Sequence, residues 1–200
     1  MSGAVLAGGA SRRMGRDKRG IPVGGVPLLR RAALAVRTVA GDLVIVCRAG
    51  APPDPGLLDM LDARVVFDRV RGGGPLAGLE AALGAARGEL VVVVAADMPW
   101  IEPAVLHLLI AEAARDPAAD VVAVGTERGP EPLLALYRRR IHTEVTRTLD
   151  TGERRMQALL GAVRLSVIPP ERWLAADPTG RTPANMNTLR DVAAAGDDRP

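Results

Sequence analysis

The chain has 200 residues, of which 48% are hydrophobic, 24% are charged and 2% are aromatic, and its formal net charge is +3. This length suits one domain with a core of Ala, Val, Leu and Ile that needs no disulfides. The scarcity of aromatic residues and the mild charge argue against a nucleic-acid-binding protein, and the single cysteine excludes a disulfide framework or a cysteine-based zinc cluster.

Short β-branched apolar runs alternate along the chain with longer segments rich in Ala and Leu. The runs predict strands at residues 3–7, 43–47, 64–67, 90–95, 120–124, 133–137 and 163–168. The longer segments predict helices at residues 27–40, 75–86, 103–115, 138–149 and 153–160. This alternation favours an α/β fold with a mostly parallel central sheet and helices on both faces. We expect a single domain over residues 1–192 and a frayed tail over residues 193–200.

The segment at residues 90–96 reads LVVVVAA without any polar alternation. Such a run is typical of a strand buried on both faces, so we expect it near the centre of the sheet. It is too short to span a bilayer, and the N-terminus, apolar first and charged afterwards, does not resemble a secretory signal. We therefore expect a cytoplasmic protein that does not enter membranes. Ligands of such sheets bind beyond the carboxyl ends of strands, which directs attention to the loops after Ala7, Phe67 and Ala96.

The first of these loops, residues 6–18, reads LAGGASRRMGRDK. Its paired glycines leave the backbone bare and permit a positive φ, and successive N–H groups in such a turn bind anions. Arg12, Arg13 and Lys18 add positive charge suited to a triphosphate. The loop matches neither the Walker motif nor the G-x-G-x-x-G fingerprint. The alternative is a Gly-rich turn followed by a solvated basic helix.

Two aspartates follow predicted strands. A carboxylate at Asp97, after the most apolar strand, is costly unless it is paired or bound to a cation, and Mg²⁺ prefers one or two carboxylates together with phosphates and water. Asp97 is thus the candidate Mg²⁺ ligand, with a helix N-cap as the alternative. Asp68 opens the segment DRVRGGGPLAG and would accept hydrogen bonds from ribose hydroxyls or a base edge; the alternative is a flexible connector.

The remaining reactive residue types form no recognisable catalytic spacing. His107 and His142 fall in predicted helices and are interpreted as surface or packing residues. Cys47 lies in an apolar run and is interpreted as a small buried hydrophobe. Ser11 has no neighbouring base in the sequence, which gives a nucleophilic serine little support.

Four motifs occur in the order and at intervals similar to those of one family: LAGG…SRRMG…DK at residues 6–18, GPLAG at 74–78, DMP at 97–99 and NMNT at 185–188. They resemble the molybdenum cofactor guanylyltransferases, and the match covers about residues 1–192. Gly9, instead of a second alanine, and the pair Arg12 and Arg13 resemble guanylyl rather than cytidylyl members. The resemblance implies a Rossmann-like nucleotidyltransferase fold and transfer of GMP from GTP to a molybdopterin-type cofactor, with release of pyrophosphate.

The resemblance also implies roles for individual residues. Nucleotide binding would fall to Leu6, Ala7, Gly8, Gly9, Lys18, Asp68 and Asp97. Catalysis would rely on Arg13, Lys18 and Asp97, with Asp97 holding Mg²⁺ as the cofactor. Asn185 and Asn187 would help to complete the site. The implied partners are GTP and the molybdopterin-type cofactor as substrates, with transient contact to proteins that handle the molybdenum cofactor.

The chain departs from the family pattern at two places. The family often has His or Gln before Pro-Leu, in a segment that would face the pterin, where this chain has Glu131. After NMNT the family usually continues Pro-Glu-Asp, of which only Asp191 is present. A cytidylyltransferase for the same cofactor, a sugar-phosphate nucleotidyltransferase and a nucleotide-binding regulator without catalysis are the alternative functions.

Overall fold

The computed structural model describes residues 1–8, 17–70, 72–186 and 191. The strands are β1 (Ser2–Leu6), β2 (Pro22–Val23), β3 (Val26–Pro27), β4 (Asp42–Cys47), β5 (Ala63–Phe67), β6 (Leu90–Ala95), β7 (Val121–Thr126), β8 (Gly129–Arg138) and β9 (Leu165–Ile168). The α-helices are α1 (Leu28–Arg37), α2 (Gly74–Ala85), α3 (Pro103–Arg115), α4 (His142–Asp150), α5 (Met156–Leu160) and α6 (Pro170–Trp173). Three 3₁₀ turns are η1 (Lys18–Gly20), η2 (Pro55–Leu58) and η3 (Arg139–Ile141).

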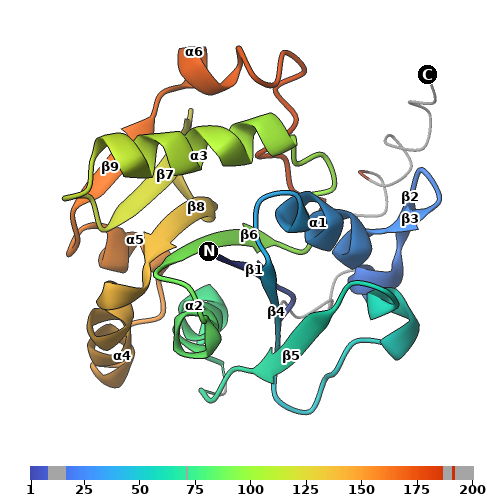
Figure 1. Ribbon diagram of the computed structural model, residues 1–200. Helices are drawn as coiled ribbons and strands as arrows, with labels where there is room; N and C mark the ends of the chain where they lie inside the picture. Colours follow the sequence, from blue (N-terminus) through green and yellow to red (C-terminus); the bar gives the residue numbers. More distant parts are fainter. Residues whose placement is uncertain (9–16, 71, 187–190, 192–200) are drawn as a thin grey trace.

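A seven-stranded sheet in the order β5-β4-β1-β6-β8-β7-β9 forms the centre of the molecule (Figure 1). The strands β5, β4, β1 and β6 run parallel, β8 is antiparallel to both of its neighbours, and β9 is parallel to β7. The predicted mostly parallel sheet is therefore confirmed. Because β8 runs in the opposite direction, its first residues lie at the edge where β6 ends, with Leu134 paired to Val94.

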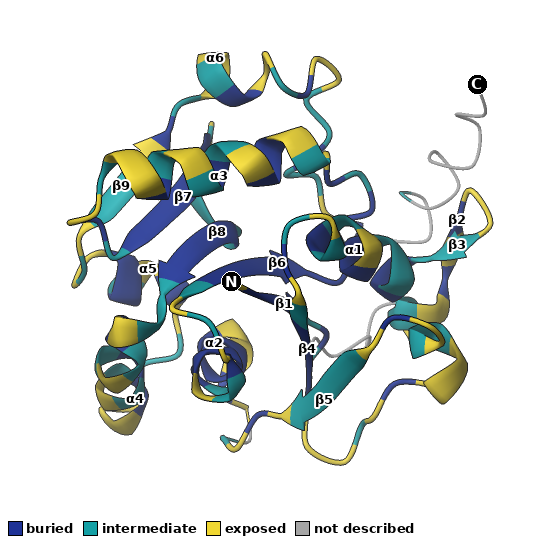
Figure 2. Ribbon diagram, in the orientation of Figure 1, coloured by how far each residue is buried: buried dark blue, intermediate teal, exposed yellow. Residues whose placement is uncertain are grey.

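The strand β6 holds the central position of the sheet, as its unbroken apolar sequence predicted. Val91 to Val94 are fully buried, and successive residues point to opposite faces. Val92 and Val94 pack in the cluster that includes α1 and α3, whereas Val91 and Val93 pack in the cluster that includes α2, α4 and α5. Helices thus cover both faces, and their buried sides face the sheet (Figure 2).

The helix α1 lies very close to β1. A β-carbon added to Gly3 would be 2.1 Å from Val36 Cγ1 and 3.0 Å from Ala40 Cβ. Only glycine leaves room for this approach, because the neighbouring atoms belong to a packed core. The contact fixes β1 against α1.

The amino ends of the strands, opposite the loop that follows β1, are joined by a polar cluster. Ser2 Oγ donates to Asp42 Oδ2 at 2.6 Å, Arg64 Nη2 donates to Asp42 Oδ1 at 2.6 Å, and the Arg87 amide donates to Asp42 Oδ2 at 3.1 Å. Burial opposes ionisation of Asp42, but these hydrogen bonds outweigh it and lower the pKa of Asp42 to about 2.

Several element boundaries differ from the predicted ones. The strand β8 continues to Arg138, so the helix expected from residue 138 begins only at His142. The helix expected at 153–160 is shorter, because Glu153 Oε1 accepts the amides of Arg154 and Arg155 in a turn that precedes Met156. Pro27 ends β3 instead of opening α1.

The hairpin formed by β2 and β3 and the short helix α6 were not predicted. The frayed tail expected at residues 193–200 lies outside the described residues. Within the residues that the structure describes, no helix combines the length and the apolar character needed to cross a membrane.

Candidate functional site

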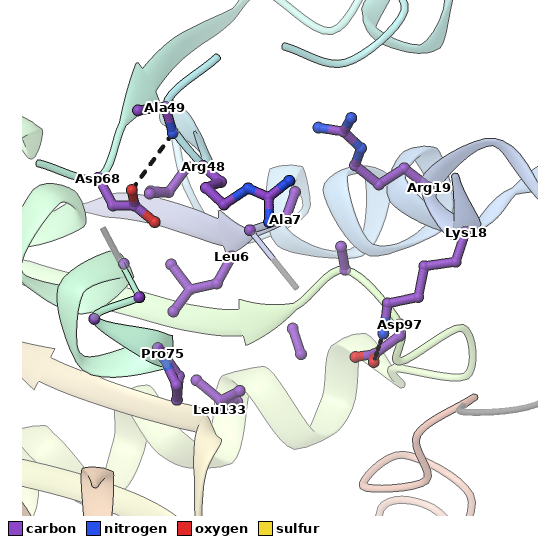
Figure 3. A pocket seen from close by; sticks show the side chains of 18 residues that line it. Leu6, Ala7, Lys18, Arg19, Arg48, Ala49, Asp68, Pro75, Asp97 and Leu133 are labelled. Atoms are coloured by element: carbon purple, nitrogen blue, oxygen red, sulfur yellow. Dashed lines mark hydrogen bonds and ion pairs between the residues drawn. The ribbon is translucent and has the colours of Figure 1, made fainter. Parts of the chain in front are cut away.

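A cavity of about 730 Å³ opens at the carboxyl ends of β1, β4, β5 and β6 (Figure 3). Its walls are Leu6, Ala7, Gly8, Lys18, Arg19, Val46, Arg48, Ala49, Asp68, Gly72, Gly73, Gly74, Pro75, Gly78, Ala95, Ala96, Asp97 and Leu133. The three loops expected to carry the ligand site all contribute. The parallel direction of the four strands explains why, since it brings their ends to one edge of the sheet.

The end of β1 forms the floor of this cavity. The Ala7 amide donates to Val46 O at 2.7 Å, and the Ala96 amide donates to Leu6 O at 3.1 Å, so strand pairing holds the chain up to the start of the loop. A β-carbon added to Gly8 would lie 3.6 Å from both Arg48 N and Asp68 Oδ2. Gly8 does not adopt a positive φ, so it contributes a bare backbone rather than an unusual conformation.

The predicted site residues Gly9, Arg12 and Arg13, together with Ser11, lie outside the described residues, as does Asn187.

Lys18 and Asp97 form an ion pair across the cavity, although 79 residues separate them in the chain. Asp97 follows β6, and Lys18 begins η1, whose N-cap is Asp17. Both partners are largely buried, with side-chain exposures of 19% for Lys18 and 15% for Asp97. The structure thus pairs the cationic and the anionic residue that the sequence singled out separately. The predicted alternative of Asp97 as a helix N-cap is not observed, because Glu102 occupies that position before α3.

Arg19, the residue after Lys18, holds the turn that positions Lys18 for its ion pair with Asp97. Arg19 donates from Nη1 to Ala51 O at 2.8 Å and from Nη2 to Pro52 O at 3.1 Å, and its guanidinium also binds Asp17. The hydrogen bond from Arg19 lowers the pKa of Asp17. Arg19 therefore ties η1 to the loop after β4 and fixes the turn from which Lys18 extends.

Asp68 lies at the opposite side of the cavity, at the end of β5. It is 9% exposed, and its Oδ1 accepts the Ala49 amide at 3.4 Å. The glycines that follow reach the start of α2, where Gly72 and Gly74 have φ values of +71° and +62°. A β-carbon on Gly78 would be 3.3 Å from Leu6 Cδ1. The predicted bare helix start is therefore part of the cavity wall and packs on β1, rather than forming a connector away from the site.

A bulge in β8 shapes the remaining wall. Ala123 of β7 pairs with Ala135, but Val124 pairs with Glu131, so residues 132–134 are extra on the β8 side. Bulges of this kind redirect side chains, and here the bulge contains Leu133, which lines the cavity.

Glu131 sits at the edge of this bulge, where the sequence departs from the pattern of the resembling family. Its Oε1 accepts the Leu133 amide at 3.0 Å. Burial raises the pKa of Glu131, and the negative charge of Asp97 adds to the effect. A carboxyl group with a raised pKa therefore lies beside the bulge that carries Leu133 to the cavity wall.

Residues 185 and 186, the described part of the predicted NMNT motif, lie next to Asp97. The Met186 amide donates to Asp97 O at 2.9 Å, and Met186 itself is buried. Asn185 is exposed next to it. The segment from the carboxyl end of the chain thus reaches the backbone of the candidate metal ligand.

The structure adds residues that the sequence interpretation missed, chiefly Arg48, Ala49 and Arg19. Arg48 follows β4 directly. The rule that selected the loops after the other parallel strands applies equally to this one, so the signal was present in the sequence.

Other residues have the structural roles that were expected of them. Cys47 is buried, and burial raises the pKa of its thiol, which does not suit a nucleophile. His142 Nε2 lies 3.3 Å from Glu80 Oε1, and Glu80, buried within α2, also binds Arg69. His107 is exposed on α3.

Among the described residues, no three His, Cys, Asp or Glu side chains converge as a metal cage. A metal at Asp97 would therefore need most of its ligands from a substrate and water, as Mg²⁺ commonly does. The site has the properties of a cleft for a phosphorylated ligand: bare backbone, a paired lysine and a strand-end carboxylate.

Comparisons with known proteins identify the family of this chain. Residues 3–166 match the model of the MobA-like NTP transferase domain. A probable molybdenum cofactor guanylyltransferase of Chloroflexus aggregans is 36% identical over 200 residues, covering 96% of this chain and 91% of the relative. A molybdenum cofactor guanylyltransferase of Desulfosudis oleivorans is 31% identical over 196 residues, covering 98% and 94%.

Solved structures show the same fold. The molybdopterin-guanine dinucleotide biosynthesis protein A of Archaeoglobus fulgidus has a TM-score of 0.79 and 29% identity, covering 98% of this chain and 97% of that chain. A nucleotidyl transferase of Methanothermobacter thermautotroptrophicus, at 22% identity, has a TM-score of 0.75. With the family model matching most of the chain and relatives above 30% identity over nearly its full length, this protein belongs to the MobA-like NTP transferase family.

Proposed function

We propose that this protein is a guanylyltransferase that transfers GMP from GTP to a molybdopterin-type cofactor and releases pyrophosphate. The observation that carries the proposal is the Lys18–Asp97 pair in a cavity built from the ends of four parallel strands. The names of the relatives, molybdenum cofactor guanylyltransferase, supply the nucleotide and the acceptor.

The two sides of the cavity suit different parts of GTP. The triphosphate would lie over the backbone of Ala7 and Gly8, near Lys18, where N–H groups and a positive charge are available. The nucleoside would lie toward Asp68 and the glycine-rich start of α2, where a buried carboxylate accepts hydrogen bonds and bare backbone permits close contact. Arg13, predicted from the sequence, would add charge beside the phosphates.

The residues present are compatible with Mg²⁺. Asp97 offers a largely buried carboxylate that is paired with the ammonium group of Lys18. The carboxylate thus binds a positively charged group at the position where it would bind a metal cation. One protein carboxylate plus phosphate oxygens and water is a normal Mg²⁺ environment. Asp97 would hold the ion, which would neutralise charge on the phosphates when bound. Lys18 would then be released to contact the triphosphate.

The reaction would be an in-line displacement. An oxygen of the terminal phosphate of the acceptor attacks the α-phosphorus of GTP, a new P–O bond forms, and the bond between the α-phosphorus and the bridging oxygen breaks to release pyrophosphate. A phosphate nucleophile is already ionised at neutral pH, so no general base is required. The protein would contribute positioning and charge stabilisation, chiefly from Lys18 and the backbone at Ala7 and Gly8.

The acceptor would approach from the side of Leu133 and Glu131. Leu133 presents an apolar surface to the cavity, and Glu131 is a partly buried carboxyl group with a raised pKa. A carboxyl group at this place would accept or donate hydrogen bonds to a polar heterocycle. Contacts with proteins that deliver or receive the cofactor, and a location in the cytoplasm, are part of the same proposal.

Pyrophosphate release, measured for each of GTP, CTP, ATP and UTP against a panel of acceptors, tests this function. We expect turnover with GTP and molybdopterin-type cofactor in the presence of Mg²⁺. Turnover with CTP and the same acceptor would instead indicate a cytidylyltransferase, and turnover with a sugar phosphate would indicate that class of enzyme. Tight GTP binding without pyrophosphate release from any pair would indicate a non-catalytic regulator.

A further inference from the structure

Arg48 occupies a position in the cavity that the proposed reaction does not use. It follows β4, lines the cavity, and in the view of Figure 3 its side chain extends into the space between Asp68 and Lys18. Within the described part of the chain, its guanidinium group forms no hydrogen bond or ion pair. A cationic fork therefore faces the same space as the buried carboxylate of Asp68.

Three hydrogen bonds hold the backbone around Arg48. The Ala51 amide donates to Arg48 O at 3.0 Å, and the Ala49 amide donates to Asp68 Oδ1 at 3.4 Å. Arg19 fixes the rest of the loop through Ala51 O at 2.8 Å. The side chain thus starts from a defined place, which limits the positions that its guanidinium group reaches and lowers the entropic cost of using it to bind a ligand.

The arrangement of charges distinguishes two parts of the cavity. Asp97, after β6, and its partner Lys18 lie where the proposed function places the triphosphate, whereas Arg48 and Asp68 lie at the ends of β4 and β5. Arg48 has only hydrogen-bond donors, and the carboxylate of Asp68 has only acceptors. A nucleoside between them would present its base to Arg48 and its remaining polar atoms to Asp68.

We propose that Arg48 determines base specificity by donating two hydrogen bonds to the O6 and N7 atoms of guanine. This inference rests on the proposed function, because that function places a guanine nucleotide in the cavity. The planar guanidinium fork matches the two adjacent acceptors of guanine, and Arg is the commonest partner of that edge. Adenine presents an amino group at position 6, so its donor would face the donors of Arg48. Cytosine carries an amino donor at position 4 and presents the same mismatch.

A contact between Arg48 and the phosphates is the competing interpretation, and the two make different predictions. A phosphate contact would serve every nucleoside triphosphate equally and would depend on charge, so lysine would largely replace arginine. A base contact would serve only nucleotides with the 6-oxo and N7 acceptors, and lysine, a point charge without a fork, would replace arginine poorly.

The test measures equilibrium binding of GTP, ITP, 7-deaza-GTP and ATP to the full chain and to Arg48→Ala and Arg48→Lys, by calorimetry with Mg²⁺ present. Arg37→Ala is the matched control, because it removes one positive charge from the far end of α1. We expect Arg48→Ala to weaken GTP and ITP about 5- to 150-fold, the scale of a bidentate base contact. The loss should be smaller for 7-deaza-GTP, which lacks N7, and absent for ATP. Arg48→Lys should recover little of the loss, and Arg37→Ala should change none of the four affinities.

Equal weakening of all four nucleotides by Arg48→Ala, or full recovery by Arg48→Lys, would overturn the inference in favour of a phosphate contact. An unchanged affinity for GTP would overturn it as well. Failure of the proposed function has a different signature, because it is judged on the unmodified chain: preference for ATP or CTP over GTP, or no turnover with the acceptor. A wild-type preference for GTP that persists in Arg48→Ala would refute only the role of Arg48.

Discussion

Gly8→Ala tests whether the bare backbone after β1 serves nucleotide binding rather than folding. In the free protein the new methyl group would lie 3.6 Å from Arg48 N and from Asp68 Oδ2, which are ordinary contact distances, and Gly8 has no positive φ that alanine would strain. We therefore expect the free energy of unfolding to change by less than about 0.5 kcal/mol. For a chain of this size, that corresponds to a shift in melting temperature of at most about 2 °C.

The same methyl group would have a large effect on the complex with GTP. It would lie beside Arg48 and Asp68, in the part of the cavity that the proposed function assigns to the nucleoside. One extra methyl group in a tightly packed contact costs about 1–3 kcal/mol, which corresponds to about 5- to 150-fold weaker binding. Titration calorimetry with GTP and Mg²⁺ measures this loss, and thermal unfolding of the same samples measures stability.

Gly20→Ala provides the matched control for this experiment. Gly20 ends η1, only two residues after Lys18, and a β-carbon there would have no atom within 4 Å. We expect neither the stability of the Gly20→Ala protein nor its affinity for GTP to change. A Gly8→Ala protein that bound GTP as tightly as the wild type would refute the placement of the nucleotide against this backbone. A fall of many degrees in its melting temperature would refute the packing argument instead.

Four further substitutions test the geometry. Lys18→Ala should lower the rate of pyrophosphate release roughly 10²-fold, and Asp97→Ala should abolish the Mg²⁺-dependent rate; near-normal rates in both variants would contradict the mechanism. Gly3→Ala should destabilise the protein by about 1–3 kcal/mol, seen as a melting temperature about 2–12 °C lower, because the methyl group would overlap α1; an unchanged melting temperature would show that α1 moves aside. Asp42→Asn should lose about 1–2 kcal/mol near pH 7. The pKa of Asp42 is lowered to about 2 from 3.8, so the difference in the free energy of unfolding between the two proteins should fade as the pH drops from about 4 to 2. Chemical denaturation across this pH range measures the difference. A difference that stayed constant would contradict the hydrogen bonds assigned to Asp42, including the one from Arg64.

The sequence alone determined the features that depend on local chemistry. The unbroken apolar run of β6 predicted a central strand, because a strand buried on both faces has no polar alternation. The carboxylate of Asp97 after that run and the glycines before α2 indicated a ligand site, because a buried charge and bare backbone are otherwise costly. The succession of strands and helices likewise predicted a parallel sheet.

The tertiary structure decided how these features meet. The pairing of Lys18 with Asp97 joins segments 79 residues apart, and no local signal specifies that contact. The direction of β8 and its bulge bring Glu131 and Leu133 to the edge where the parallel strands end. Arg48 belongs to the same edge because β4 lies between β1 and β5. Residue types and periodicity express what each segment requires of its own surroundings, whereas strand order and direction result from packing across the whole sheet, and these determine which loops share a cavity.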